Sequence, residues 1–107
     1  MKFYKNLYVS KLVENKKDKI IEKLKQKDFP MILCYIIVLL EEGENQMEFY
    51  STGLLHQKQL ERDDLFIVGL AAGYRDAIHL VQEITSEVYE ETGGADIRAY
   101  IREKEMC

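Results

Sequence analysis

Histidine and cysteine are the residue types in this 107-residue sequence best suited to chemistry at neutral pH, and there are two of each. His79 lies one helical turn before Glu83, so the two side chains could touch one metal ion. A metal site needs about three or four ligands, and two on a polar helix face do not supply them. His56 lies in a polar stretch without a catalytic partner at a recognisable spacing. We therefore predict no catalytic residue, no metal, no cofactor and no enzymatic activity.

The two cysteines have neither the spacing of a metal site nor that of a redox pair. Cys34 lies inside an apolar segment, where a cysteine is usually buried and inert, and Cys107 is the last residue. A nucleophilic thiol would need exposure and a nearby base. We expect two free thiols, which suits a reducing cytoplasm.

A glycine-containing segment precedes the helix that carries His79. Gly69 and Gly73 lie before the helix start, where backbone N–H groups can bind a phosphate. The segment lacks both the lysine of a P-loop and the three-glycine spacing of a dinucleotide-binding turn. We therefore expect these glycines to permit close packing rather than to bind an anion.

Charge is distributed unevenly, although the net charge is only −4. Residues 1–28 carry nine lysines against four acidic residues, a net of +5, and residues 29–107 carry six basic against fifteen acidic residues, a net of −9. Four lysines of one predicted helix could contact nucleic-acid phosphates, namely Lys16, Lys19, Lys23 and Lys27. Acidic residues interleave with them, which is more typical of the solvated face of an amphipathic helix. Nucleic-acid binding is therefore the alternative hypothesis.

A third hypothesis, that the protein mimics nucleic acid, draws on an acidic helix face. Its residues are Glu83, Glu87, Glu90 and Glu91. Acidic helix faces are common in bacterial proteins, so this hypothesis ranks below the other two.

The strands and helices that position these residues are predicted from the periodicity of apolar residues and from the residues typical of turns and helix ends. Strands are predicted at 3–10, 31–41, 47–52 and 65–71, and helices at 15–28, from 74 to the glycines at 93 and 94, and at 96–103. Asn15 is expected to cap the first helix, and residues 42–45 are expected to form a hairpin turn. Residues 55–64 stay unassigned.

This order, β-α-β-β-β-α-α, predicts a single α+β domain over residues 1–107. We expect a two-layer sandwich with a mainly antiparallel sheet, the last three strands forming a meander and the helices packed on one face. A helix, a three-stranded meander and a helix is also the order of a double-stranded-RNA-binding domain. The last long helix is acidic here, which opposes phosphate binding along it.

The segment 31–40 is apolar on both alternating faces, which is typical of a strand inside a sheet and covered on both sides. With the helices on one face, the second face needs another cover: a protein partner, a second copy of the chain, the last helix or residues 54–60. We expect an interaction surface there, made by Ile32, Cys34, Ile36 and Val38. The leading hypothesis is therefore a non-enzymatic protein-interaction module that binds a partner or itself.

A membrane role is not expected. The longest apolar run, residues 29–40, has twelve residues, whereas a membrane-spanning helix needs about 20. Lys5 and Asn6 interrupt the apolar residues at the N-terminus, which therefore lacks the pattern of a signal peptide. We expect a cytoplasmic protein.

Several stretches of the chain resemble a family of small uncharacterised proteins. They are residues 3–10, 48–50, 68–74 and 92–96, with Ala77, Leu80, Val81, Ile84, Glu87 and Tyr89. Such proteins are encoded in Gram-positive bacteria, frequently on conjugative or other mobile elements. The resemblance covers nearly the whole chain, but it consists of glycines and core positions and brings no functional residues with it. It implies a bacterial cytoplasmic setting and an accessory role on a mobile element.

Overall fold

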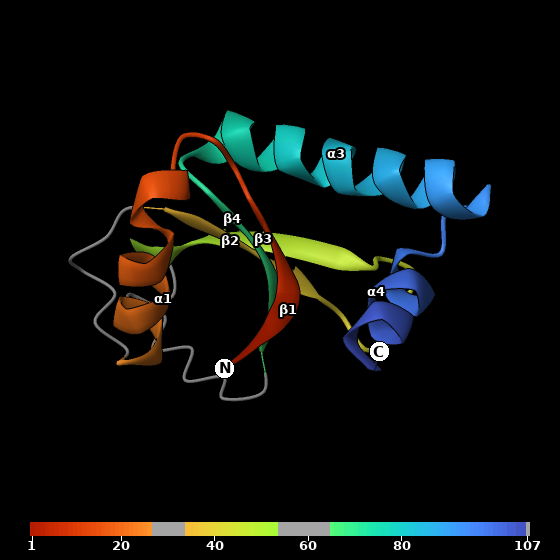
Figure 1. The fold of residues 1–107 in the computed structure, drawn as a ribbon, viewed down its shortest axis with the longest axis horizontal. Helices are drawn as coiled ribbons and strands as arrows, with labels where there is room; N and C mark the ends of the chain where they lie inside the picture. Colours follow the sequence, from red (N-terminus) through yellow and green to blue (C-terminus); the bar gives the residue numbers. More distant parts are fainter. Residues whose placement is uncertain (27–33, 54–64, 107) are drawn as a thin grey trace.

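The structure is a computed structural model that describes residues 1–26, 34–53 and 65–106. Its elements are β1 (Lys2–Val9), a short 3-10 helix η1 (Glu14–Lys16), α1 (Lys17–Lys25), β2 (Tyr35–Leu39), β3 (Met47–Ser51), β4 (Phe66–Ala71), α3 (Tyr74–Thr92) and α4 (Ile97–Met106). The predicted α+β class and the predicted order of strands and helices are confirmed (Figure 1).

The four strands form one mixed sheet in the order β1-β4-β2-β3. β1 pairs with β4 in parallel, whereas β2 pairs antiparallel with both β4 and β3, so the sheet is mainly antiparallel as predicted. β2 lies inside the sheet, which explains its apolar residues on both faces. The predicted meander is wrong. β3 and β4 run in the same direction on opposite sides of β2, and parallel strands require a crossover of about a dozen residues rather than a tight turn.

The helices lie on both faces of the sheet, not on one face as predicted. Alternate residues of β2 point to opposite faces. Ile37 belongs to the apolar cluster of α3 and α4, whereas Ile36 belongs to the cluster that contains Ile20 and Leu24 of α1. Figure 1 shows α1 and α3 on different sides of the strands. The expected two-layer sandwich therefore has a third layer, because α1 covers the second face, and the analogy to a double-stranded-RNA-binding domain fails with the meander.

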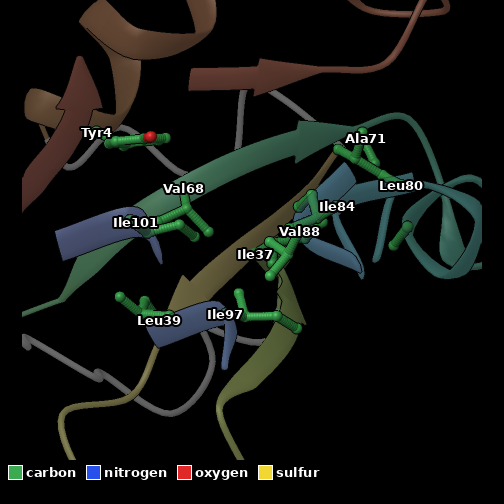
Figure 2. Packing of buried hydrophobic residues seen from close by; sticks show 11 residues of the cluster. Tyr4, Ile37, Leu39, Val68, Ala71, Leu80, Ile84, Val88, Ile97 and Ile101 are labelled. Atoms are coloured by element: carbon green, nitrogen blue, oxygen red, sulfur yellow. The ribbon is translucent and has the colours of Figure 1, made fainter. Parts of the chain in front are cut away.

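The cluster on the α3 side holds the two C-terminal helices against the sheet. Ala77, Leu80, Ile84 and Val88 recur at helical spacing on α3, and all four are buried. Ile97 and Ile101 of α4 meet the same cluster, which includes Ile37, Leu39 and Val68 of the strands (Figure 2). α3 ends where Gly93 adopts a left-handed conformation with φ of 74°, as the sequence predicted. None of the helices in the described ranges is long and apolar enough to cross a membrane.

Gly69 marks an irregularity at which β4 and α3 come close. Ile37 of β2 pairs with Gly69 and the next residue, Val38, pairs with Ile67, so Val68 is an extra residue in β4. A Cβ at Gly69 would lie 3.1 Å from Ile37 Cδ1 and 3.2 Å from Leu80 Cδ2. The glycine therefore serves close packing, as expected, although it lies in the strand rather than in the turn.

Candidate functional site

The lysines of the predicted nucleic-acid-binding helix are divided between two elements. Lys16 lies in η1 and is the residue before α1, where no side chain caps the helix, so the predicted Asn15 cap is absent. Lys19 and Lys23 lie in α1, and Lys27 lies outside the described residues. Lys16 and Lys19 are exposed and Lys23 is half-buried. Exposed acidic side chains lie among them, namely Glu14, Asp18 and Glu22.

The residues predicted to form an interaction surface on β2 are covered by the chain itself. Cys34, Ile36 and Val38 are at most 2% exposed and lie in one apolar cluster with α1. Ile32 lies outside the described residues. A partner could reach this face only by displacing α1, so the expected surface is not accessible in the folded chain. The expectation failed because α1 occupies the face that the sequence left uncovered.

Cys34 is a structural thiol. Burial raises its pKa to about 11, and the weaker effect of the hydrogen bond with Thr52 lowers it. The backbone N–H of Cys34 also donates to Thr52 Oγ1 at 3.3 Å. A buried thiol that keeps its proton at neutral pH does not act as a nucleophile.

The start of α3 is occupied by a carboxylate of the chain. Asp76 Oδ2 accepts hydrogen bonds from the Ser10 hydroxyl and from the Ala72 N–H, the latter at 2.7 Å. His79 and Glu83 follow along the same side of α3, are exposed, and line a pocket of about 520 Å³ with Ser10 and Asp76. No set of three metal-binding side chains occurs in the described part of the chain, and His56 lies outside it. Asp76 therefore links the first turn of α3 to the residue that follows β1 and to the turn before the helix.

The acidic flank of α3, the side that carries Asp76, Glu83 and Glu87, faces β1. The Tyr8 hydroxyl donates to Glu87 Oε2. Burial first, and then Glu87, raise the pKa of Tyr8, and the same two causes raise the pKa of Tyr100 on α4. Through these hydrogen bonds, Asp76 and Glu87 connect α3 to Ser10, which follows β1, and to Tyr8 in β1. This flank therefore has a partly structural role.

The opposite side of α3 is apolar and faces β3. Tyr74 of α3, Phe49 of β3 and Tyr35 of β2 form a cluster that we call the aromatic surface. The ring centroids of Phe49 and Tyr74 are 5.6 Å apart, and those of Tyr35 with Phe49 and Tyr74 are 6.1 and 6.3 Å apart. Tyr74 is 58% exposed, and farther along the helix Tyr89 is 65% exposed. The surface therefore offers large aromatic side chains to solvent.

The candidate site residues predicted from the sequence did not include Tyr35, Phe49 or Tyr74. A signal was present, since one apolar flank of α3 runs through Tyr74, Ile78, Val81, Thr85 and Tyr89 at helical spacing. This flank lies beside the buried residues of α3. The apolar part of the helix surface therefore extends beyond the part that the sheet covers. An apolar arc wider than the core requires is a sign of a surface that binds.

A second pocket, of about 530 Å³, lies where α4 meets the strands. Charged residues that line it form contacts with other parts of the protein. Arg102 Nη2 donates to the Glu41 carbonyl at 2.9 Å, and Glu105 Oε2 accepts from the Lys5 backbone N–H at 3.0 Å. Lys2 Nζ lies 5.4 Å from the centroid of the Phe66 ring. These contacts explain the side chains as parts of the fold, and the aromatic surface is the stronger candidate.

Comparison with known proteins finds no matching family model, no matching curated protein and no matching solved structure.

Proposed function

We propose that this protein is a non-enzymatic protein-interaction module and that it binds its partner through the aromatic surface. The observation that carries the proposal is the exposure of Tyr74 beside Phe49 and Tyr35. Tyrosine and phenylalanine are enriched at protein interfaces, where a few buried aromatic side chains supply most of the binding energy.

The side chains considered for catalysis support this proposal because they have structural roles. Cys34 is buried, and the carboxylates of Asp76 and Glu87 accept hydrogen bonds from β1 and its end. We also propose that the protein is cytoplasmic and has an accessory role on a bacterial mobile element. This part of the proposal is based on the sequence resemblance, which includes residues 68–74, and not on any contact in the fold.

Partner capture with matched variants tests the interaction surface. Tyr74→Asp places a charge in the aromatic surface, and Leu12→Asp is the control, because Leu12 is 73% exposed and lies outside this surface. A protein retained by the wild type is purified and titrated against both variants. We expect Tyr74→Asp to weaken binding at least about tenfold, as is usual for a central aromatic residue, and Leu12→Asp to leave binding unchanged. Equal affinity for the wild type and Tyr74→Asp would contradict the proposal.

Nucleic-acid binding through Lys16, Lys19, Lys23 and Lys27 remains the alternative proposal. The observation in its favour is that Lys16 and Lys19 are exposed at the end of the chain with excess positive charge. Fluorescence anisotropy against duplex RNA, duplex DNA and single strands, at low and near-physiological salt, tests it. Binding that weakens steeply with salt and is lost in the double variant Lys16→Glu/Lys19→Glu would support it. Lack of binding at low salt would exclude it.

A further inference from the structure

Arg75 is an exposed arginine in the first turn of α3, next to Tyr74 of the aromatic surface. Its side chain forms no hydrogen bond, ion pair or ring contact with any residue in the described part of the chain. Arg98 and Arg102 of α4, the other arginines in the described ranges, donate hydrogen bonds to backbone carbonyls of the turn between β2 and β3. Arg75, in contrast, has no contact that explains it as part of the fold.

Helix geometry places Arg75 at the border between the apolar flank of α3 and solvent. Successive residues of an α-helix are turned by about 100°, so Arg75 is about 60° from Ile78, a half-buried residue of that flank. Residues three apart are neighbours on a helix surface. The buried Ala77 lies on the other side of the flank. A side chain of a partner that packs on Tyr74 and Ile78 therefore comes within reach of the Arg75 guanidinium.

The described carboxylates that adjoin Arg75 and the aromatic surface in sequence are engaged elsewhere. Asp76 follows Arg75 and accepts a hydrogen bond from the Ser10 hydroxyl, at the end of β1. Glu48 of β3 accepts from the Tyr50 hydroxyl, and alternation along the strand puts both on the sheet face opposite to the aromatic surface. The positive charge of Arg75 is therefore available for a carboxylate of another molecule.

We propose that the partner binds through a short acidic segment, in which an aspartate or glutamate pairs with Arg75 while an apolar side chain beside it packs on the aromatic surface. This inference rests on the proposed function and names the chemistry of the partner. A guanidinium and a carboxylate can form two parallel hydrogen bonds, which fixes their relative orientation. Tyrosine and arginine are the residue types that supply much of the binding energy at protein interfaces. The rings thus provide affinity, and Arg75 selects partners that carry a carboxylate.

The charge of α3 favours an acidic peptide over a nucleic acid at this surface. Arg75 is the one arginine or lysine of α3, and the helix also contains five acidic residues. A peptide can bring a single carboxylate to the start of the helix. A nucleic acid carries a phosphate at every nucleotide, and the exposed Glu83 and Glu90 farther along α3 would repel these phosphates. One cation beside apolar rings therefore fits an isolated carboxylate and not a polyanion.

Selection from a library of short random peptides displayed on phage, with the full chain as the target, tests the chemistry of the partner. We expect the enriched peptides to share an aspartate or glutamate within a few residues of a leucine, phenylalanine or tryptophan. An enriched set without the acidic residue would overturn the inference. Failure to enrich any peptide would overturn it as well, because the proposed partner binds through a short segment.

Charge reversal in matched variants tests the pairing with Arg75. Fluorescence anisotropy of a selected peptide is measured with the wild type, with Arg75→Glu, and with the control Lys17→Glu, which reverses an exposed charge on α1 across the sheet. We expect Arg75→Glu to weaken binding at least about fivefold and Lys17→Glu to change it less than about twofold. A peptide with lysine in place of its acidic residue should bind Arg75→Glu more tightly than the wild type. The neutral variant Arg75→Gln, which should weaken binding less than Arg75→Glu does, keeps the test decisive if the reversed charge disturbs folding.

Failure of this inference is distinguishable from failure of the proposed function. Peptide binding that is lost in Tyr74→Ala but unchanged in Arg75→Glu removes the acidic segment and keeps the aromatic surface. Peptide binding that is unchanged in both variants removes both. Binding of duplex or single-stranded DNA that is lost in Arg75→Glu would assign a phosphate partner to this surface and would also overturn the acidic segment.

Discussion

Gly69 shows how a single missing side chain determines the distance between a helix and the sheet. It follows the extra residue Val68 in β4, and both residues face the side on which α3 packs. Any Cβ at Gly69 would press on Ile37 and Leu80, at distances shorter than ordinary packing allows. At the residue scale, packing thus explains Gly69. The expected close packing is wrong for Gly73, where a Cβ would meet no atom within 4 Å.

We expect Gly69→Ala to lower the free energy of unfolding by about 1–3 kcal/mol, because an added methyl group overpacks a close contact. Gly73→Ala is the matched control, since a Cβ at Gly73 would meet no atom within 4 Å. Its effect should stay within about 0.5 kcal/mol. Urea unfolding midpoints of the two variants and the wild type provide the measurement. A midpoint for Gly69→Ala equal to that of the control would show that Ile37 and Leu80 move aside freely.

At the element scale, α3 has two flanks with different tasks. One flank carries carboxylates that accept hydrogen bonds from Tyr8 and Ser10, and it fastens the helix to β1 and its end. The other carries Tyr74, which packs on Phe49 of the edge strand β3, and the exposed Tyr89 farther along the helix. The proposed binding surface is therefore held in place by polar contacts on the opposite side of the same helix.

The Tyr8–Glu87 contact predicts a pH dependence of stability at alkaline pH. The pKa of Tyr8 is raised in the folded chain above its ordinary value of about 10, by burial and by Glu87. Its stabilisation is complete below pH about 10 and decreases as the pH rises further, because the unfolded chain then loses the proton while the folded chain retains it. The urea midpoint should decrease from pH 9 to 11, and Tyr8→Phe should reduce that decrease. Tyr89→Phe, at an exposed position on the other flank, should leave the slope unchanged; a Tyr8→Phe slope equal to that of the wild type would contradict this role.

At the scale of the whole molecule, one sheet carries a helical layer on each face. α1 closes one face with Ile20 and Leu24, and α3 and α4 close the other. The doubly apolar strand β2 is therefore satisfied within the chain. The proposed aromatic surface lies where the α3 side of the sheet reaches the edge strand β3.

Removal of the α1 side of the core tests this arrangement. Leu24 is buried, so Leu24→Ala should lower the free energy of unfolding by about 2–5 kcal/mol through lost burial and the cavity left behind. The same substitution at the exposed Leu12 should have almost no effect. Thermal unfolding followed by circular dichroism measures both. If Leu24→Ala were as mild as Leu12→Ala, α1 would not be part of the core.

Local patterns in the sequence were sufficient for the elements. The spacing of Ala77, Ile84 and Val88, with Gly93 after them, predicted α3 to within a residue, and the apolar residues of β2 predicted a strand inside the sheet. Both follow from interactions within a few residues, because periodicity reports which side chains are buried and glycine marks where a helix ends.

The sequence by itself therefore determined the fold class, the order of the elements and the burial of β2, whereas the tertiary structure decided the sheet order, the face that α1 covers and the position of the aromatic surface. Alternation along β2 distinguishes Ile36 from Ile37 but does not say which helix covers which. Tyr35, Phe49 and Tyr74 belong to three elements, and only the pairing of β2 with β3 and the docking of α3 bring them together. Contacts between distant segments depend on how whole elements pack, and a local pattern holds no information about that packing.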